Sequence, residues 1–425
     1  MNDLLLGLTD VLVAAGWLLQ LVLNGALQLL GLYLLGNVLY LLFFALAGHR
    51  RARVLPPAPA APAAPRRMCV LLPAYQADAV ILQTAPAALA HAYAGALTVC
   101  VVADGLQPTT VAALRTQGAQ VVEVRFARST KGQALQAALA TLPATAYDVA
   151  VVLDVDNVMA PGFLARVNEA FAAGYQVVQG HRTAKNLDSP FAVLDACNEA
   201  INNHIFRLGH ARLGMSASLI GSGMAFDYTY LQQLLHNIGE TAGEDKEIDF
   251  RILRDGVPIG YLPEADVYDE KIANAGVFGT QRTRWMAAQL EFLRKYGPEA
   301  LSQLRRGRLE FVDKIVQSAL LPRVLLLGLL TLLLGLALLL PAGWGPPPAW
   351  WAGLLAGTAL ALLLALPRRF YSRPVATALL HLPLALLAMT RALSRLGRAR
   401  GTFLPTPHAA HAPQPPEPAA APLPS

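Results

Sequence analysis

Long apolar segments without charged side chains lie near both ends of the chain. Residues 4–47 contain one charged residue, Asp10, and residues 25–47 contain none. A helix that crosses a bilayer needs about 20 apolar residues, so residues 25–47 predict a spanning helix. The basic residues at 49–53 that follow predict that this end faces the cytosol. The pattern leaves open whether residues 4–23 form a separate span or an interfacial segment.

The second apolar region predicts a helical hairpin over residues 324–366. No charged residue lies between Arg323 and Arg368, and the sequence PAGWGPPP at 341–348 interrupts this region near its middle. The apolar segment at 374–390 follows and has arginines on both sides. Charges at both ends favour an interfacial helix or a re-entrant element over a further span.

The region between the apolar segments has the pattern of an α/β domain. Short runs rich in β-branched residues alternate with helix-like segments, which predicts βαβ units and a parallel sheet. Ligands of such sheets bind beyond the carboxyl ends of the strands. The predicted strands are residues 68–73, 97–102, 120–125 and 148–154, and the predicted helices are residues 77–91, 108–117 and 132–142.

Composition agrees with a membrane protein. Only 15% of the 425 residues are charged, against about 25% in a typical soluble domain. The net charge of +6 comes with arginines beside the apolar runs, so we interpret it as flanking charge and expect no nucleic-acid partner. The sparse cysteines, Cys69, Cys100 and Cys197, predict core residues in a reducing compartment.

These patterns divide the chain into six parts. The predicted parts are a membrane anchor (1–53), a Pro/Ala linker (54–67), the α/β domain (68–300), an interfacial region (301–323), a C-terminal membrane region (324–400) and a Pro/Ala-rich tail (401–425) that we expect to be disordered.

Acidic residues follow two of the predicted strands. Asp154 and Asp156 close the fourth strand, and on an extended segment two side chains two positions apart share a face. Carboxylates there can hold a divalent cation through hard oxygen ligands. The alternative is a solvated turn, in which Asp and Asn are common. Asp104, followed by Gly105, ends the second strand and is either a ligand for a nucleobase or ribose or part of an ordinary turn.

Three further groups carry candidate chemistry. Lys131 precedes a predicted helix and is either a phosphate ligand or a surface lysine. Glu244 and Asp245 are either a general base and its neighbour or helix-capping acids. The segment 281–285, QRTRW, offers arginine for a diphosphate and tryptophan for a sugar face, although the same residue types are common in interfacial helices.

The order of these signals resembles that of family 2 glycosyltransferases. The segment PAYQ at 73–76, Asp104, Lys131-Gly132, the D-x-D at 154–156, GSGMAF at 221–226, Glu244-Asp245 and Q-x-x-R-W at 281–285 follow one another as they do in that family. The sequence is most similar to the membrane-embedded branch that includes cellulose, chitin, hyaluronan and poly-N-acetylglucosamine synthases. The similarity covers about residues 68–290.

The resemblance implies a GT-A fold, an inverting mechanism and a divalent metal, Mg or Mn. By motif matching, Asp104 would bind the nucleotide, Asp156 would ligate the metal, and Asp154 would contact the metal and the ribose or sugar. Asp245 would be the base, with Glu244 beside it. The remaining matched positions would bind substrate, and they are Pro73, Tyr75, Lys131, Gln281, Arg284 and Trp285.

The sequence departs from the family pattern at two motifs. Ala103 stands where many members have a second aspartate, and Gly243 precedes Glu244 where polymer synthases often have threonine. The C-terminal membrane region is also short. These departures bring processive polymer synthesis into doubt and leave single-sugar transfer to a lipid open.

We therefore expect an inverting transferase in the inner (plasma) membrane with a cytosolic catalytic domain. Its partners would be a nucleotide-sugar donor, UDP-linked, a glycan or lipid acceptor, and membrane lipids. Two alternatives are transfer to a polyprenyl phosphate carrier and a non-catalytic membrane scaffold with a degenerate transferase domain. A transporter fits less well, because no spanning segment carries paired charges.

Overall fold

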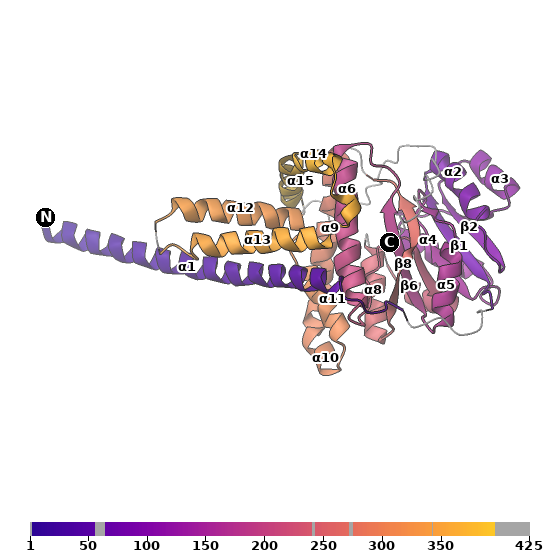
Figure 1. The fold of residues 1–425 in the computed structure, drawn as a ribbon, viewed down its shortest axis with the longest axis horizontal. Helices are drawn as coiled ribbons and strands as arrows, with labels where there is room; N and C mark the ends of the chain where they lie inside the picture. Colours follow the sequence, from indigo (N-terminus) through magenta and orange to yellow (C-terminus); the bar gives the residue numbers. More distant parts are fainter. Residues whose placement is uncertain (1, 56–63, 240–242, 272–274, 342, 396–425) are drawn as a thin grey trace, which may run out of the picture.

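The computed structural model describes residues 2–55, 64–239, 243–271, 275–341 and 343–395. An α/β domain forms one end of the molecule, and apolar helices project from it (Figure 1). The middle of the predicted linker and the predicted tail lie outside the described residues.

A mixed eight-stranded sheet organises the α/β domain. The strands lie side by side in the order β3-β2-β1-β4-β7-β6-β8-β5. Their bounds are β1 Met68–Tyr75, β2 Leu97–Asp104, β3 Gln120–Val124, β4 Val149–Val152, β5 Val158–Met159, β6 Val177–Ala184, β7 Met224–Asp227 and β8 Ile259–Asp269.

The sheet is parallel in its first half and mixed in its second. Strand β1 pairs in parallel with β2 and β4, and β2 pairs in parallel with β3. These four strands are the ones that the hydrophobic pattern predicts. The parallel pairing that the sequence predicts for them is confirmed. The sequence did not predict β7, which runs antiparallel to both β4 and β6 and makes the whole sheet mixed. The antiparallel direction places the start of β7, Met224, beside the end of β4, Val152.

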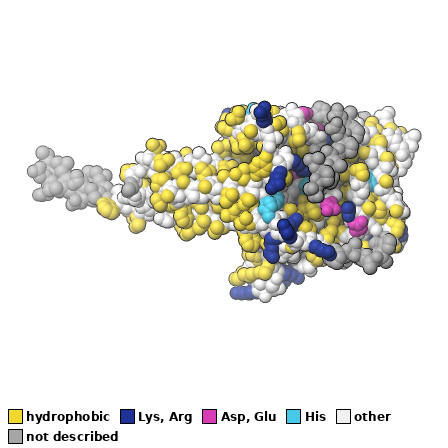
Figure 2. Space-filling view, in the orientation of Figure 1, with side chains coloured by type: hydrophobic (Ala, Val, Ile, Leu, Met, Phe, Trp, Pro, Cys, Tyr) yellow, Lys and Arg dark blue, Asp and Glu magenta, His cyan; other side chains and the backbone are white. Residues whose placement is uncertain are grey.

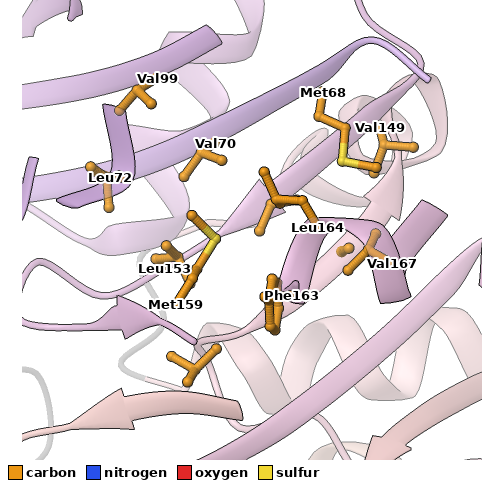
Figure 3. Packing of buried hydrophobic residues seen from close by; sticks show 14 of the residues in the cluster. Met68, Val70, Leu72, Val99, Val149, Leu153, Met159, Phe163, Leu164 and Val167 are labelled. Atoms are coloured by element: carbon orange, nitrogen blue, oxygen red, sulfur yellow. The ribbon is translucent and has the colours of Figure 1, made fainter. Parts of the chain in front are cut away.

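Helices cover both faces of the sheet and bury it. On one face Met68, Val70, Leu72 and Leu153 pack against Phe163 and other residues of the helices there (Figure 3). On the other face the side chains of the same strands pack against a second set of helices. The first set is α2 Asp78–Leu89, α3 Pro108–Thr116 and α5 Phe163–Ala172, and the second is α4 Lys131–Thr141, α7 Tyr228–Leu235 and α8 Glu244–Asp255.

The cysteines are core residues, as the sequence predicts. Cys69 and Cys100 are fully buried in β1 and β2, and Cys197 of α6 (Pro190–Asn203) is buried in a separate apolar cluster. Burial raises the pKa of the Cys197 thiol to about 11. The three thiols therefore have no reactive character in this fold.

The remaining helices lie between the domain and the projecting bundle, or form that bundle. Helix α6 Pro190–Asn203 continues into a π-helical turn, η1 His204–Gly209. The others are α1 Asn2–Ala47, α9 Ala275–Tyr296, η2 Gly297–Glu299, α10 Ala300–Arg305, α11 Leu309–Ala319, α12 Arg323–Leu339, α13 Pro348–Ala365, η3 Arg368–Phe370, α14 Arg373–Leu379 and α15 Leu382–Arg395.

Several of these helices are apolar and long enough to cross a membrane. Among the described residues, 14–47 of α1 and the whole of α13 qualify alone. Two pairs qualify if each counts as one bent span: α11 with α12, bent by 56°, and α14 with α15, bent by 44°. Helices α12 and α13 are the two arms of the hairpin that the sequence predicts.

Helix α1 is one continuous helix of 46 residues, without a break near residue 24. At about 1.5 Å per residue it is roughly twice as long as a bilayer core is thick. The Asn24 side chain donates to the Gly343 carbonyl (2.8 Å) and accepts from the Gly345 amide (2.6 Å). Residues 24–47 thus run along the hairpin, and the preceding residues extend beyond its tip (Figure 1).

Apolar side chains fill the space between α1, α12 and α13. Leu34, Val38, Leu326, Leu330 and Trp351 are all buried there. The outer surface of the bundle is also apolar, while Lys and Arg side chains gather where the bundle meets the α/β domain (Figure 2). This distribution is typical of a membrane boundary at that junction.

Candidate active site

The candidate site lies at the edge of the sheet where β1, β2 and β4 end. Asp104, the last residue of β2, is only 4% exposed. Its carboxylate accepts a hydrogen bond from the Ser129 hydroxyl. Its backbone carbonyl accepts one from the backbone N–H of Gln76 (2.9 Å). Tyr75, at the end of β1, is 37% exposed, and Pro73 is half-buried in the same strand.

The backbone after β1 and β2 turns sharply at this edge. Gln76 has φ +47° and Gly105 has φ +70°, both in the left-handed region. A Cβ on Gly105 would lie 3.1 Å from Cγ of Gln76, so a larger residue there would crowd the neighbouring turn. Non-glycine residues rarely adopt such a φ, and where they do the strain is often found at functional sites.

The segment 154–157 forms a turn after β4. Strand β4 ends at Val152, and the backbone N–H of Asn157 donates to the backbone carbonyl of Asp154 (3.1 Å). The expectation that Asp154 and Asp156 share a face of an extended strand was therefore wrong. Asp154 keeps about a third of its side chain exposed, whereas Asp156 is 4% exposed. The turn gives the two carboxylates different surroundings.

Asn157 connects this turn to two other segments. Its side-chain nitrogen, Nδ2, donates to Asp156 Oδ1 (3.1 Å) and to Asp269 Oδ1 at the end of β8 (3.0 Å). Its amide oxygen accepts from the Ser222 hydroxyl. Asn157 is 2% exposed, so these bonds form away from water and fix the position of the Asp156 carboxylate.

Lys131 stands at the start of α4 and faces the same turn. Its Nζ donates to the Asp154 carboxylate and to the Gly221 carbonyl (2.5 Å). Burial works against the charged ammonium, but the nearby carboxylates of Asp154, Glu244 and Asp245 outweigh it and raise the pKa of Lys131. The lysine is an internal cation of the site and not a solvated surface residue.

The glycine-rich segment before β7 approaches Lys131 and Asp245 closely. Gly221 has φ +84°. A Cβ at this position would lie 3.9 Å from Lys131 Nζ and 4.0 Å from Asp245 Cβ. Ser222, which is fully buried, accepts from the Asp154 amide (2.9 Å). The glycine thus allows the backbone to pass between the lysine and the acids.

Glu244 and Asp245 form the first turn of α8, and both side chains are half-buried. Asp245 Oδ1 accepts from the Lys246 amide (2.9 Å). A Cβ on Gly132 would lie 3.5 Å from Glu244 Cβ, so Glu244 lies against the start of α4. Shielding from water raises the pKa of Glu244 to about 7; Asp245 adds to this rise, and Lys131 opposes it.

Helix α9 presents the Q-x-x-R-W residues. Trp285 is 38% exposed, and Gln281 and Arg284 are half-buried. The arginine between them, Arg282, is 7% exposed, forms an ion pair with Asp195 of α6 (2.5 Å) and lies 4.3 Å from the centroid of the Trp285 ring. The structure therefore gives Arg282 a role in holding α9 against α6, which the sequence did not indicate.

A buried cluster of charged residues lies behind the turn at 154–157. Glu199 of α6 pairs with Arg182 of β6 (2.7 Å) and with Lys271 (3.3 Å), and Lys271 also pairs with Asp269 (2.6 Å). Strong attraction from Arg182 and the other cations keeps the Glu199 pKa low despite burial. Through Asp269 the cluster reaches Asn157, so it supports the turn that carries Asp154 and Asp156.

The sequence analysis missed this cluster. In the sequence, the signal for it is weak: charged residues stand within segments that are otherwise rich in apolar residues. Arg182 in a strand and Glu199 in a helix are examples. Their partners are far away in sequence, so no spacing rule could pair them.

The carboxylates of Asp154 and Asp156 suit a divalent cation whose remaining ligands come from a bound substrate and from water. Asp154 and Asp156 offer hard oxygen atoms, which Mg²⁺ and Mn²⁺ prefer. No group of three or more His, Cys, Asp or Glu side chains with metal-site geometry occurs among the described residues. Mg²⁺ is commonly held by one or two carboxylates with phosphates and water completing the shell. The residues present suit that arrangement and not a closed structural site.

A cavity of about 360 Å³ lies elsewhere, among Arg66, Asp148, Phe171, Tyr175 and Asp227. Asp227 ends β7 and pairs with Val149 at the start of β4, which is the opposite edge of the sheet from the carboxylates. None of the predicted site residues lines this cavity.

Comparison with known proteins identifies the family and the fold. The protein-family model described as "Glycosyltransferase like family 2" matches residues 65–288, about half of the chain. A search of curated proteins gave no match. Residues 65–288 contain every predicted site residue.

Two solved structures illustrate the similarity. The mannosyltransferase PcManGT from Pyrobaculum calidifontis, in complex with GDP-Man and Mn²⁺, is 18% identical; the match covers 88% of this chain and 98% of that chain with a TM-score of 0.51. Glucosyl-3-phosphoglycerate synthase from Mycobacterium tuberculosis, with Mn²⁺, UDP-glucose and phosphoglyceric acid, is 20% identical and covers 52% of this chain and 78% of that chain, with a TM-score of 0.35. The first of these shows the GT-A fold that the resemblance implies.

The raised pKa of Glu244 predicts a pH-dependent stability. A carboxyl with an ordinary pKa of 4.5 and a folded-state pKa of about 7 stabilises the fold below about pH 4.5, and this contribution is lost as the pH rises to 7. Each pKa unit corresponds to about 1.4 kcal/mol. The variant Glu244→Gln should therefore lose less stability than the wild type between pH 4.5 and 7 in denaturant unfolding of the detergent-solubilised protein.

The matched control for this experiment is Glu264→Gln, which removes an exposed carboxyl and should leave the pH dependence unchanged. Parallel curves for Glu244→Gln and the wild type would contradict the assigned environment of Glu244.

Proposed function

Because this chain belongs to the glycosyltransferase-like family 2 and is a glycosyltransferase, we propose that it moves a sugar from a nucleotide sugar to an acceptor beside the membrane. The observation that carries this proposal is the convergence of acidic groups at one edge of the sheet. Asp104 ends β2, Asp154 and Asp156 follow β4, and Asp245 begins α8 close to Gly221.

The donor would lie across the ends of β1, β2 and β4. Asp104 would accept hydrogen bonds from the nucleoside, with Pro73 and Tyr75 beside it. The family resemblance favours a UDP-linked sugar, whereas the mannosyltransferase from Pyrobaculum calidifontis has GDP-Man bound. Both nucleotides therefore belong in any test.

Asp156 and Asp154 would hold a divalent cation, Mg²⁺ or Mn²⁺, which when bound neutralises charge on the diphosphate. Asn157 keeps the Asp156 carboxylate in place through the 3.1 Å hydrogen bond. Lys131 adds a positive charge beside Asp154 and would attract the phosphates. Arg284 would do the same from α9.

Asp245 would act as the general base. In an inverting transfer the acceptor hydroxyl gives its proton to the base while its oxygen bonds to the anomeric carbon, and the bond from that carbon to the diphosphate breaks. The nucleoside diphosphate then leaves with the electron pair. Glu244 is the rival base, because a pKa of about 7 is well matched to proton transfer near neutral pH.

The acceptor would approach from the bundle side of the site. Helix α9 carries Gln281, Arg284 and the exposed Trp285 and packs against α15 and α11. Among the described residues, Leu330, Trp351 and their neighbours fill the space between α1, α12 and α13, so a growing glycan would have no path between these three helices. This packing favours a membrane lipid that receives one sugar over an extruded polymer.

The catalytic domain would face the cytosol, at the inner membrane of the cell. The arginines at 50–53, 305–308 and 368–373 lie on the domain side of the helices, as the positive-inside rule requires. Nucleotide sugars made in the cytosol would then reach the site directly.

The function is tested by incubating the purified full chain with UDP- and GDP-linked sugars and membrane lipids, and measuring nucleotide release. We expect release with one donor class, loss of activity in excess chelator, and recovery with Mg²⁺ or Mn²⁺. Asp156→Ala should lower turnover by at least about 100-fold, and a cooperative melting transition should show that the variant is still folded. Full activity in chelator would remove the metal from the proposal, and no release with any donor would contradict the function.

The base is tested by comparing two isosteric variants in the same assay. Asp245→Asn keeps the shape of the side chain but removes its basic oxygen, so kcat should fall by about 10²–10⁴-fold while donor affinity persists. Glu244→Gln should be milder. The reverse ranking would assign the base to Glu244, and two active variants would place the base elsewhere.

The topology is tested by labelling single introduced cysteines in intact cells with a membrane-impermeant maleimide. The native cysteines are buried, so they give little background. Pro341→Cys, at the hairpin tip, should react in intact cells, and Ala52→Cys should react only after permeabilisation. Labelling of Ala52→Cys from outside would overturn the orientation.

A further inference from the structure

One irregular segment, residues 216–223, connects the active site to the helices at the membrane boundary. It has neither helical nor strand structure, yet much of it is buried, and Ser218, Leu219 and Ser222 are at most 4% exposed. Its position therefore depends on hydrogen bonds to other elements instead of on a regular backbone ladder.

On the catalytic side, three consecutive residues of the segment contact the site. The Ile220 carbonyl accepts from Arg182 (3.3 Å), and the Gly221 carbonyl accepts from Lys131 (2.5 Å). The Ser222 hydroxyl accepts from the Asp154 amide (2.9 Å). A shift of the segment would therefore move the lysine and the carboxylate together.

On the membrane side, a lysine of α11 contacts the segment both directly and through an aspartate of α8. The Lys314 ammonium donates to the Ser218 hydroxyl (2.7 Å) and to Asp249 Oδ2 (2.8 Å). The other oxygen of Asp249 accepts from the Leu219 amide (3.1 Å). Lys314 is 3% exposed and Asp249 is fully buried, so this ion pair is shielded from solvent and its geometry is well defined.

The same network continues into α1. The Ser218 hydroxyl donates to Gln317 Oε1 (3.0 Å), and the Gln317 amide donates to Asp313 Oδ2 (2.7 Å). Asp313 in turn accepts from the Tyr40 hydroxyl (2.8 Å). An unbroken series of hydrogen bonds thus joins α1 and α11 to the segment and, through it, to Asp154.

We propose that Lys314 is a positioning residue for the transferase reaction: it ties α11 to residues 216–223 and so sets the placement of Lys131 and Asp154. The inference rests on the proposed function of the Asp154 site. Lys314 does not contact the site itself. Its effect on the reaction passes through Ser218, Leu219 and Gly221.

A purely structural ion pair would behave differently from a positioning one, and two variants separate the cases. Lys314→Met leaves Asp249 buried without its partner, which is strongly destabilising. The double variant Lys314→Met/Asp249→Leu removes both charges, and such apolar replacements of a buried pair are often neutral for stability. It also removes the bond from Lys314 to Ser218 and the bond from Leu219 to Asp249, so the segment is held less firmly although the fold is kept.

The experiment compares the wild type, the double variant and Ser218→Ala in nanodiscs. It measures melting temperature, donor turnover, nucleoside diphosphate affinity and hydrogen–deuterium exchange of residues 216–227. The double variant should melt near the wild-type temperature but exchange faster at the amides of residues 219–222, and its kcat should fall at least about tenfold. Nucleoside diphosphate affinity should fall as well, because Lys131 and Asp154, which the segment holds, would bind the diphosphate directly or through the cation. Ser218→Ala should change in the same direction.

The matched control is Glu299→Gln. It removes the ion pair between Glu299 and Arg254, near the C-terminal end of α8 (2.5 Å), and this pair does not contact the segment. It should leave kcat and exchange unchanged. Wild-type kcat or unchanged exchange in the stable double variant would overturn the positioning role. If the wild type transfers no sugar at all, the proposed function fails, and the exchange measurement still decides whether Lys314 fixes the segment.

Discussion

The positive charge of Lys131 holds together parts of the chain that would otherwise repel each other. Asp154 follows β4, and Glu244 and Asp245 begin α8; all three lower the energy of the ammonium form. Like charges so close together and partly shielded from water would be costly without a cation among them. The same ammonium binds the Gly221 carbonyl, so one side chain joins the start of α4 to the turn after β4 and to the glycine-rich segment, and attracts the acids of α8. The placement of most groups in the site depends on this contact.

The sequence predicts the parallel half of the sheet and most of the acidic groups, because both follow from local patterns. Continuous apolar runs mark β1 to β4, and Asp104 and Asp154 come directly where those strands end. The local turn at 154–157 was not predictable from alternation, since its shape depends on bonds from Asn157 to Asp269 and Ser222, which are far away in the sequence. Strand β7 itself was missed for the same reason: its four residues do not show which strands they pair with.

Charged residues at the domain boundary show more clearly that contacts between distant parts of the chain cannot be predicted from local patterns. In the sequence, Lys314 looks like any cation of an interfacial helix, and Arg282 looks like part of a motif whose other arginine carries the function. In the fold both are buried and paired, with Asp249 and Asp195 respectively. Burial of a charge is decided by the tertiary partner that compensates it, and a single sequence contains no information on that partner. The aromatic contacts of Phe250 with Tyr296 and Phe311 likewise join α8 to α9 and α11 without any signal in spacing.

The solid packing of α1, α12 and α13 has a consequence for the sidedness of the membrane. If the acceptor is the membrane lipid proposed above, a lipid glycosylated beside the described bundle would find the space between α1, α12 and α13 filled by Leu326, Leu330 and Trp351 and would remain in the leaflet where it was made. The headgroup, now larger and more polar, crosses the hydrocarbon layer less readily than before. Synthesis by this chain would thus create an asymmetry between the two leaflets, and moving the product to the other leaflet would require a separate lipid translocator.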